Sequence, residues 1–183
     1  MTITRRLLIA LAAVCLFAGS AQAQSLDPEN TLYLDLPTGR VVIQMRPDLA
    51  PQHVARIKEL TRKGFYDGLV FHRVLEGFMA QTGDPKGDGT GGSGQKLPAE
   101  FSFEPHVRGT VSMARSSSIN SADSQFFIVF KRANHLNNKY TVWGKVVEGM
   151  ENVDRIQMGD KNANGFVYNP TAIVKMQVAA DAK

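Results

Sequence analysis

The stretch FHRVLEGFMAQTGD, residues Phe71 to Asp84, decides the fold. It joins two short runs of largely apolar residues, Leu69–Val74 and Phe78–Gln81, across Glu76-Gly77. Runs of this length with a glycine between them are typical of β-strands joined by a turn. Taken alone, its Phe and Met side chains would be core and Arg73 would be solvated.

Six further runs of the same kind occur along the chain, separated by Gly, Pro and Asn. They are Thr31–Leu36, Val41–Met45, Val111–Ala114, Gln125–Phe130, Val142–Val146 and Ile173–Val178. Leu36-Pro37-Thr38-Gly39-Arg40 is typical of a tight hairpin turn between the first two. Eight short strands predict one mainly β domain, either a barrel or a sandwich.

Two segments interrupt the strand pattern and are predicted to be helices. Pro51–Arg62 begins with proline at a favourable first helical position and places Val54, Ile57 and Leu60 on one stripe. Glu148–Met158 has a similar apolar spacing and is shorter. We expect these two helices to cap the open ends of a barrel.

The N-terminal residues 1–23 have the pattern of a signal peptide. Arg5 and Arg6 precede the short apolar run Leu7–Phe17, and Ala21-Gln22-Ala23 provides small residues at a cleavage site. The run is too short for a membrane span, which needs about 20 residues. We expect Sec export to the periplasm, although the paired arginines leave twin-arginine export open and a retained N-terminal anchor is the alternative to cleavage. Residues 24–183 would then form a single domain without a membrane span.

Composition excludes several classes of function. Removal of residues 1–23 removes two arginines, no acidic residue and the only cysteine, which lowers the net charge from +4 to +2. A charge this small does not indicate binding to nucleic acid or anionic lipid. Without cysteine, the mature chain forms no disulfide and has no thiol nucleophile.

The remaining motifs do not indicate a cofactor or metal. Gly87, Gly89 and Gly92 fit G-x-G-x-x-G, but residues 93–98, SGQKLP, cannot begin the helix that a dinucleotide site needs. No histidine lies in a zinc-binding HExxH pair, and no serine lies in a G-x-S-x-G turn. We interpret His72 as structural, and the long glycine-rich loop Gly83–Pro98 as functional or mobile.

Five segments in order resemble the cyclophilins. They are Phe71–Asp84, Gly89-Thr90-Gly91-Gly92, Ser112-Met113-Ala114, Ser124–Ile128, and Leu136 with Val142-Trp143-Gly144-Lys145-Val146. The resemblance extends from about Thr31 to Val178. Within the family, the chain is most similar to the bacterial exported branch. It implies a closed eight-stranded antiparallel β-barrel capped by two helices, and cis/trans isomerisation of the bond before proline without cofactor or metal.

The same resemblance implies a set of site residues. Arg73, Gln81 and Phe78 match catalytic positions of the family, with Arg73 as the donor to the prolyl nitrogen and Gln81 as the residue that orients it. The substrate-binding positions match Met79, Ala114, Arg115, Gln125, Phe127, His135, Leu136 and Tyr140. Phe126 alternates with Phe127 along the strand and should point into the core.

Four residues differ from the common family pattern. Many cyclophilins have tryptophan at the position of His135, where it contributes to cyclosporin binding, so the resemblance implies weakened affinity for this drug. Tyr140 stands where histidine is common, and Arg115 replaces a common asparagine. Trp143 occupies a core position that is usually phenylalanine.

The sequence thus favours a monomeric prolyl isomerase acting on proline-containing, unfolded or partly folded exported polypeptides. A non-catalytic module or chaperone that binds proline segments on the same fold is the alternative. Such a module would bind a proline peptide without accelerating its isomerisation. A ligand-holding barrel would need small interior residues, whereas the strands carry bulky Ile, Val, Phe and Met.

Overall fold

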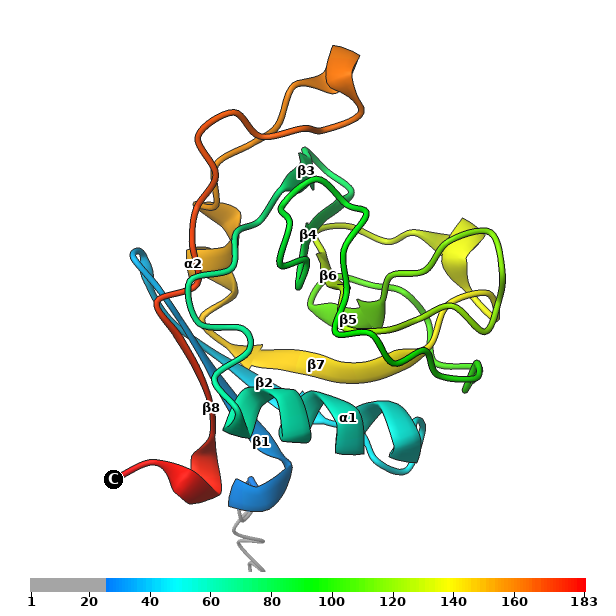
Figure 1. Ribbon diagram of the computed structural model, residues 1–183, viewed down its shortest axis with the longest axis vertical. Helices are drawn as coiled ribbons and strands as arrows, with labels where there is room; N and C mark the ends of the chain where they lie inside the picture. Colours follow the sequence, from blue (N-terminus) through cyan, green and yellow to red (C-terminus); the bar gives the residue numbers. More distant parts are fainter. Residues whose placement is uncertain (1–25) are drawn as a thin grey trace, which may run out of the picture.

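The computed structural model describes residues 26–183, which form one antiparallel sheet of eight strands with two α-helices (Figure 1). The predicted signal peptide, residues 1–23, lies outside the described residues. The strands follow the order β3-β4-β6-β5-β7-β2-β1-β8 across the sheet. Their bounds are β1 Thr31–Leu36, β2 Gly39–Met45, β3 Arg73–Leu75, β4 Met79–Thr82, β5 Thr110–Met113, β6 Phe126–Val129, β7 Val142–Glu148 and β8 Lys175–Val178.

The sheet is curled but open, so the expectation of a closed barrel was wrong. Strands β3 and β8 are its edges. The gap between them is crossed only by scattered bonds between residues 68–74 and 165–174, such as the isolated bridge Val70↔Ala172 and Phe71 N to Thr171 O at 3.0 Å. Because the pairing here is only an isolated bridge, the predicted strands Leu69–Val74 and Ile173–Val178 are reduced to β3 and β8, which begin at Arg73 and Lys175.

The helices confirm one predicted boundary and correct the other. Helix α1 spans Pro51–Arg62, as expected, and lies against β8. Helix α2 covers only Met150–Asp154, against β2. It is shorter than predicted because Gly149 has a left-handed φ of 79° before it, and because the Gln157 N–H bonds to the Thr171 hydroxyl after it.

The predicted hairpin between β1 and β2 is present. Leu36 pairs with Gly39, which leaves Pro37 and Thr38 as the two turn residues. Short 3-10 helices complete the chain, among them η2 (Asn134–Leu136) and η3 (Lys161–Ala163).

The two faces of the sheet hold separate apolar clusters. The inner face packs the main core, in which Phe126, Ile128 and Trp143 are fully buried. On the outer face, Met79 and Phe127 pack with residues from the segment around η2, among them Leu136. Because side chains alternate along a strand, neighbouring residues Phe126 and Phe127 belong to different clusters. The predicted core positions of Phe126 and Trp143 are therefore confirmed.

Within residues 26–183, no helix has the length and apolarity needed to cross a membrane. The same residues contain no group of three or more His, Cys, Asp or Glu side chains placed to hold a metal ion.

Three histidines are buried in the domain, namely His53, His72 and His106. Burial lowers the pKa of each, because an imidazolium loses its hydration there. For His53, the carboxylate of Glu100 at 2.6 Å from Nδ1 opposes this effect without reversing it. The folded protein therefore keeps these rings neutral at pH values where an unfolded chain would protonate them.

The free energy of unfolding should consequently fall as the pH decreases below about 6.5, the ordinary pKa of histidine. The unfolded chain then takes up protons that the folded chain does not accept. Urea unfolding of residues 24–183 at pH 7.5, 6.5 and 5.5 measures this slope. In His106→Gln, which keeps a hydrogen-bonding side chain without a titration in this range, the slope should be shallower. A free energy that stays constant or rises towards pH 5.5 would contradict the assignment.

Candidate active site

Strand register brings three predicted site residues into one row on the outer face. Arg73 of β3 pairs with Gln81 of β4, and Gln81 pairs with Phe127 of β6. Directly opposed residues of antiparallel strands present their side chains on the same face. Residues that are 54 positions apart in the chain, from 73 to 127, thus become neighbours through two strand pairings.

The guanidinium of Arg73 is held by neutral oxygen atoms. Nη1 donates to Gln81 Oε1 at 3.2 Å, Nε donates to the backbone oxygen of Asn164 at 3.0 Å, and Nη2 donates to Asn164 Oδ1 at 3.1 Å. No carboxylate forms an ion pair with Arg73 among the described residues. Partial burial lowers the pKa of Arg73, yet an arginine stays protonated in proteins. The site therefore presents an uncompensated positive charge.

Beside this charge lies a hollow of about 270 Å³. Met79, Phe127 and Leu136 are buried side chains of its apolar part. His106 stacks behind Phe127 with ring centroids 6.2 Å apart, and its Nε2 lies 3.1 Å from the Ser112 hydroxyl. This backing supports Phe127 at a fixed position on the outer face.

The rim of the hollow is aromatic and basic. Tyr140 packs edge-on to Phe127, at 5.8 Å between ring centroids, and the Arg115 guanidinium lies 4.6 Å from the centre of the Tyr140 ring. Arg115 also donates to the backbone oxygen of Lys139. On the other side, the exposed ring of His135 lies 5.4 Å from that of Phe78.

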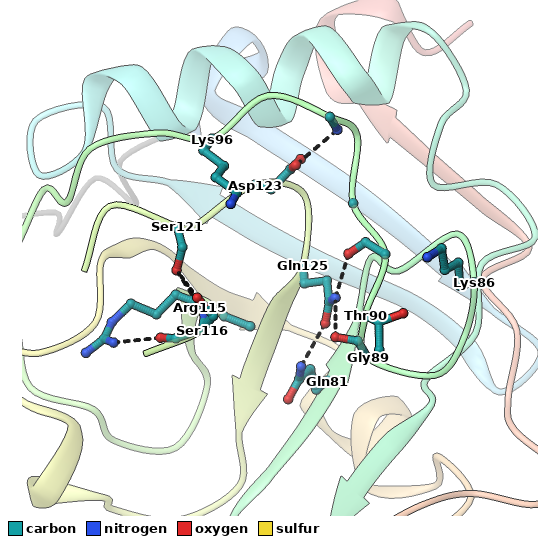
Figure 2. A pocket seen from close by; sticks show the side chains of 14 residues that line it. Gln81, Lys86, Gly89, Thr90, Lys96, Arg115, Ser116, Ser121, Asp123 and Gln125 are labelled. Carbon is teal, nitrogen blue, oxygen red and sulfur yellow. Dashed lines mark hydrogen bonds between the residues drawn. The ribbon is translucent and has the colours of Figure 1, made fainter. Parts of the chain in front are cut away.

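A second hollow of about 420 Å³ adjoins the first and is walled by the glycine-rich loop. Figure 2 shows Gln125 in the wall of this second hollow, between Gln81 and the glycine-rich loop at Gly89. Its Nε2 donates to the backbone oxygens of Gly89 and Gly91, and its Oε1 accepts from Gln81 Nε2 at 2.9 Å. A chain of amides thus connects the loop to Gln81 and Arg73.

The loop has a defined structure because two carboxylates organise its backbone. Asp84 accepts from Gly89 N at 2.6 Å, and Asp123 accepts from Ser93 N at 2.8 Å and from Gly94 N at 3.0 Å. A Cβ at Gly91 would lie 2.1 Å from Asp84 Oδ1, so a larger residue there would displace the carboxylate that organises the loop. No helix follows the loop, which agrees with the interpretation that its G-x-G-x-x-G pattern is structural.

The structure brings the predicted site residues together. Ten of the eleven line the first hollow: Arg73, Phe78, Met79, Gln81, Ala114, Arg115, Phe127, His135, Leu136 and Tyr140. Gln125, the eleventh, lines the second hollow and reaches the first through Gln81. Asn164 was missed, because the sequence Asn164-Gly165 indicates a turn but does not show which residue the turn contacts.

Comparison with known proteins agrees with this geometry. Residues 31–178 match the family described as cyclophilin type peptidyl-prolyl cis-trans isomerase/CLD. The chain is 54% identical to a probable peptidyl-prolyl cis-trans isomerase of Brucella suis, with all of both chains covered. It is 42% identical to peptidyl-prolyl cis-trans isomerase B of Bacillus subtilis, over 72% of this chain and 93% of the relative.

Solved structures show the same fold. A cyclophilin from Hirschia baltica superposes with a TM-score of 0.78 at 26% identity, covering 87% of this chain and 77% of the other. A Cryptosporidium parvum cyclophilin crystallised in the presence of the dipeptide Ala-Pro superposes with a TM-score of 0.75 at 26% identity, covering 81% of this chain and 98% of the other. The chain therefore belongs to the cyclophilin-type peptidyl-prolyl cis-trans isomerases.

Proposed function

We propose that the first hollow binds the proline of an Xaa-Pro segment and that Arg73 accelerates rotation about the preceding peptide bond. The observation that carries this assignment is the Arg73 guanidinium, fixed beside an apolar hollow and without an anionic partner among residues 26–183. Met79, Phe127 and Leu136 offer apolar contact to a pyrrolidine ring. The part of the substrate before the ring stays free to turn.

The chemistry requires no bond to break. The barrier, about 18–20 kcal/mol, comes from conjugation of the amide nitrogen with its carbonyl. Twisting removes this conjugation and leaves the prolyl nitrogen with a lone pair that can accept a hydrogen bond. A guanidinium aimed at that nitrogen stabilises the twisted amide and not the planar one, which lowers the barrier.

The other site residues would support this step. Gln81 holds Nη1 of Arg73 and would orient the substrate carbonyl, while Phe78 and His135 form the rim. Ala114 and Arg115 line both hollows and Gln125 lines the second, where an extended substrate backbone would pass. We propose that the protein acts as a monomer on proline-containing segments of unfolded or partly folded exported polypeptides.

Replacement of Arg73 tests the mechanism. Arg73→Ala and Arg73→Lys should both lower kcat/KM by about 100-fold to 1000-fold, the scale for loss of one transition-state donor. Lysine keeps the charge but not the planar fork that Gln81 and Asn164 hold. A protease-coupled Xaa-Pro peptide assay measures the rate, and thermal unfolding checks the fold.

Arg132→Ala serves as the matched control, because Arg132 is exposed and does not line the hollow. Full activity in Arg73→Ala would contradict the mechanism. Wild-type binding of a proline peptide without any acceleration, seen by NMR exchange, would instead favour the non-catalytic binding module.

The drug-binding expectation concerns His135 on the rim. The imidazole of His135 is smaller than the indole of tryptophan and offers less contact area to a bound ligand. We therefore propose that cyclosporin binds weakly to this protein. His135→Trp should tighten cyclosporin binding by about tenfold, as expected for a buried aromatic contact, with little change in kcat/KM. Isothermal titration measures the affinity. Wild-type binding as tight as that of His135→Trp would contradict the proposal.

Export is proposed from the N-terminal sequence. Residues 1–23 lie before the family match at 31–178 and combine Arg5-Arg6, an apolar run and Ala21-Gln22-Ala23. Expression in a two-membrane bacterium should place a chain beginning at Gln24 in the periplasmic fraction, as read by intact mass. An uncleaved chain in the cytoplasm or in the membrane pellet would contradict cleavage.

The export route is tested by replacing Arg5 and Arg6 together with lysine. This change keeps the positive charge of the N-terminus, so Sec export should continue. Loss of the periplasmic product in the double variant would show twin-arginine export instead.

A further inference from the structure

Asn164 holds two of the three nitrogens of the Arg73 guanidinium. Nε donates to its backbone oxygen at 3.0 Å and Nη2 donates to its side-chain oxygen Oδ1 at 3.1 Å. We infer that Asn164 is a positioning residue that sets the plane of this guanidinium. The inference rests on the proposed function, because it assigns to Asn164 an action through Arg73.

The geometry of the contact explains why one residue can orient the group. Nε and Nη2 lie along one edge of the planar guanidinium, and two acceptors on the same edge define its plane. If Gln81 were the only partner, the guanidinium could still rotate about its single hydrogen bond, the 3.2 Å bond from Nη1 to Gln81 Oε1. With both residues in place, three N–H donors are fixed and the rest stay available for substrate.

Asn164 is suited to this contact by its backbone conformation. Its φ of 53° is left-handed, which asparagine tolerates better than most residues. The turn is fixed by the bond from Gly165 N to Asp160 O at 2.8 Å. Val74 clamps it on both sides, since Val74 N donates to Gly165 O at 2.8 Å and Gly159 N donates to Val74 O at 3.0 Å.

These two bonds connect the turn to the strand that carries Arg73. Because Val74 directly follows Arg73 in β3, the turn is fixed relative to the backbone of Arg73. Figure 1 shows the segment between α2 and β8 passing beside β3. Asn164 itself is exposed and makes no core contact, so its side chain can be changed without opening the core.

Asn164→Gly isolates the side-chain contact. Glycine keeps the left-handed backbone and the carbonyl that accepts from Nε, and removes the side chain with its acceptor Oδ1. We expect kcat/KM to fall about fivefold to tenfold, the scale for the net contribution of one hydrogen bond at an exposed residue, with an unchanged melting temperature. The NMR signal of the Arg73 Nε–H should broaden or shift as the guanidinium gains freedom.

Asn138→Gly is the matched control. Asn138, at φ 58°, is the other non-glycine residue of positive φ among residues 26–183, and it does not line either hollow next to Arg73. It should keep wild-type activity and an unchanged Arg73 signal. This control measures how much activity changes when asparagine is replaced by glycine at a left-handed position away from Arg73.

A double-variant cycle shows whether Asn164 acts through Arg73. In an Arg73→Lys background, Asn164→Gly should change the residual rate less than twofold, as measured by NMR exchange at high enzyme concentration. An equal loss in both backgrounds, or wild-type activity in Asn164→Gly alone, would overturn the inference. An inactive wild type, or a fully active Arg73→Ala variant, would overturn the proposed function instead.

Discussion

The site depends on one constraint, a guanidinium for which the described part of the chain, residues 26–183, provides no counter-ion. Partial removal of the Arg73 charge from water is unfavourable unless other groups replace its hydration. Here the replacement comes from neutral oxygens of Gln81 and Asn164, so the charge is oriented but not cancelled. A carboxylate in the same place would hold Arg73 as well, but it would compete with any electron pair that a substrate offers.

This requirement extends through the fold by hydrogen bonds. Gln81 is held by Gln125, and Gln125 is held by the backbone of the glycine-rich loop. The loop in turn is shaped by the carboxylates of Asp84 and Asp123. The glycine-rich loop Gly83–Pro98, which the sequence indicated to be functional or mobile, is thus one end of a polar network that supports the site. Alternation along the strands lets the same sheet keep a dry core on its other face.

Local pattern was sufficient for most of the elements but not for their ends. The apolar stripe and the first proline of Pro51–Arg62 were enough to predict that helix. The turn residues Pro37 and Thr38 were likewise enough to predict the β1–β2 hairpin. Whether the sheet closes depends on how residues 165–174 pack beside residues 68–74. The spacing of apolar residues along the chain does not predict this packing. The gathering of Arg73 with Phe127 was expected from resemblance, whereas the Asn164 contact spans 91 positions and arises from tertiary packing alone.

The central claim is that one fixed guanidinium and one apolar hollow act on the same proline. A crystal structure of residues 24–183 with a short Ala-Pro-containing peptide tests it most directly. We expect the pyrrolidine ring to lie against Met79, Phe127 and Leu136. An Arg73 N–H should point at the prolyl nitrogen while the bonds from Arg73 to Gln81 and Asn164 are retained. A proline bound outside this hollow, or an Arg73 turned away from the prolyl nitrogen in a bound and active complex, would contradict it.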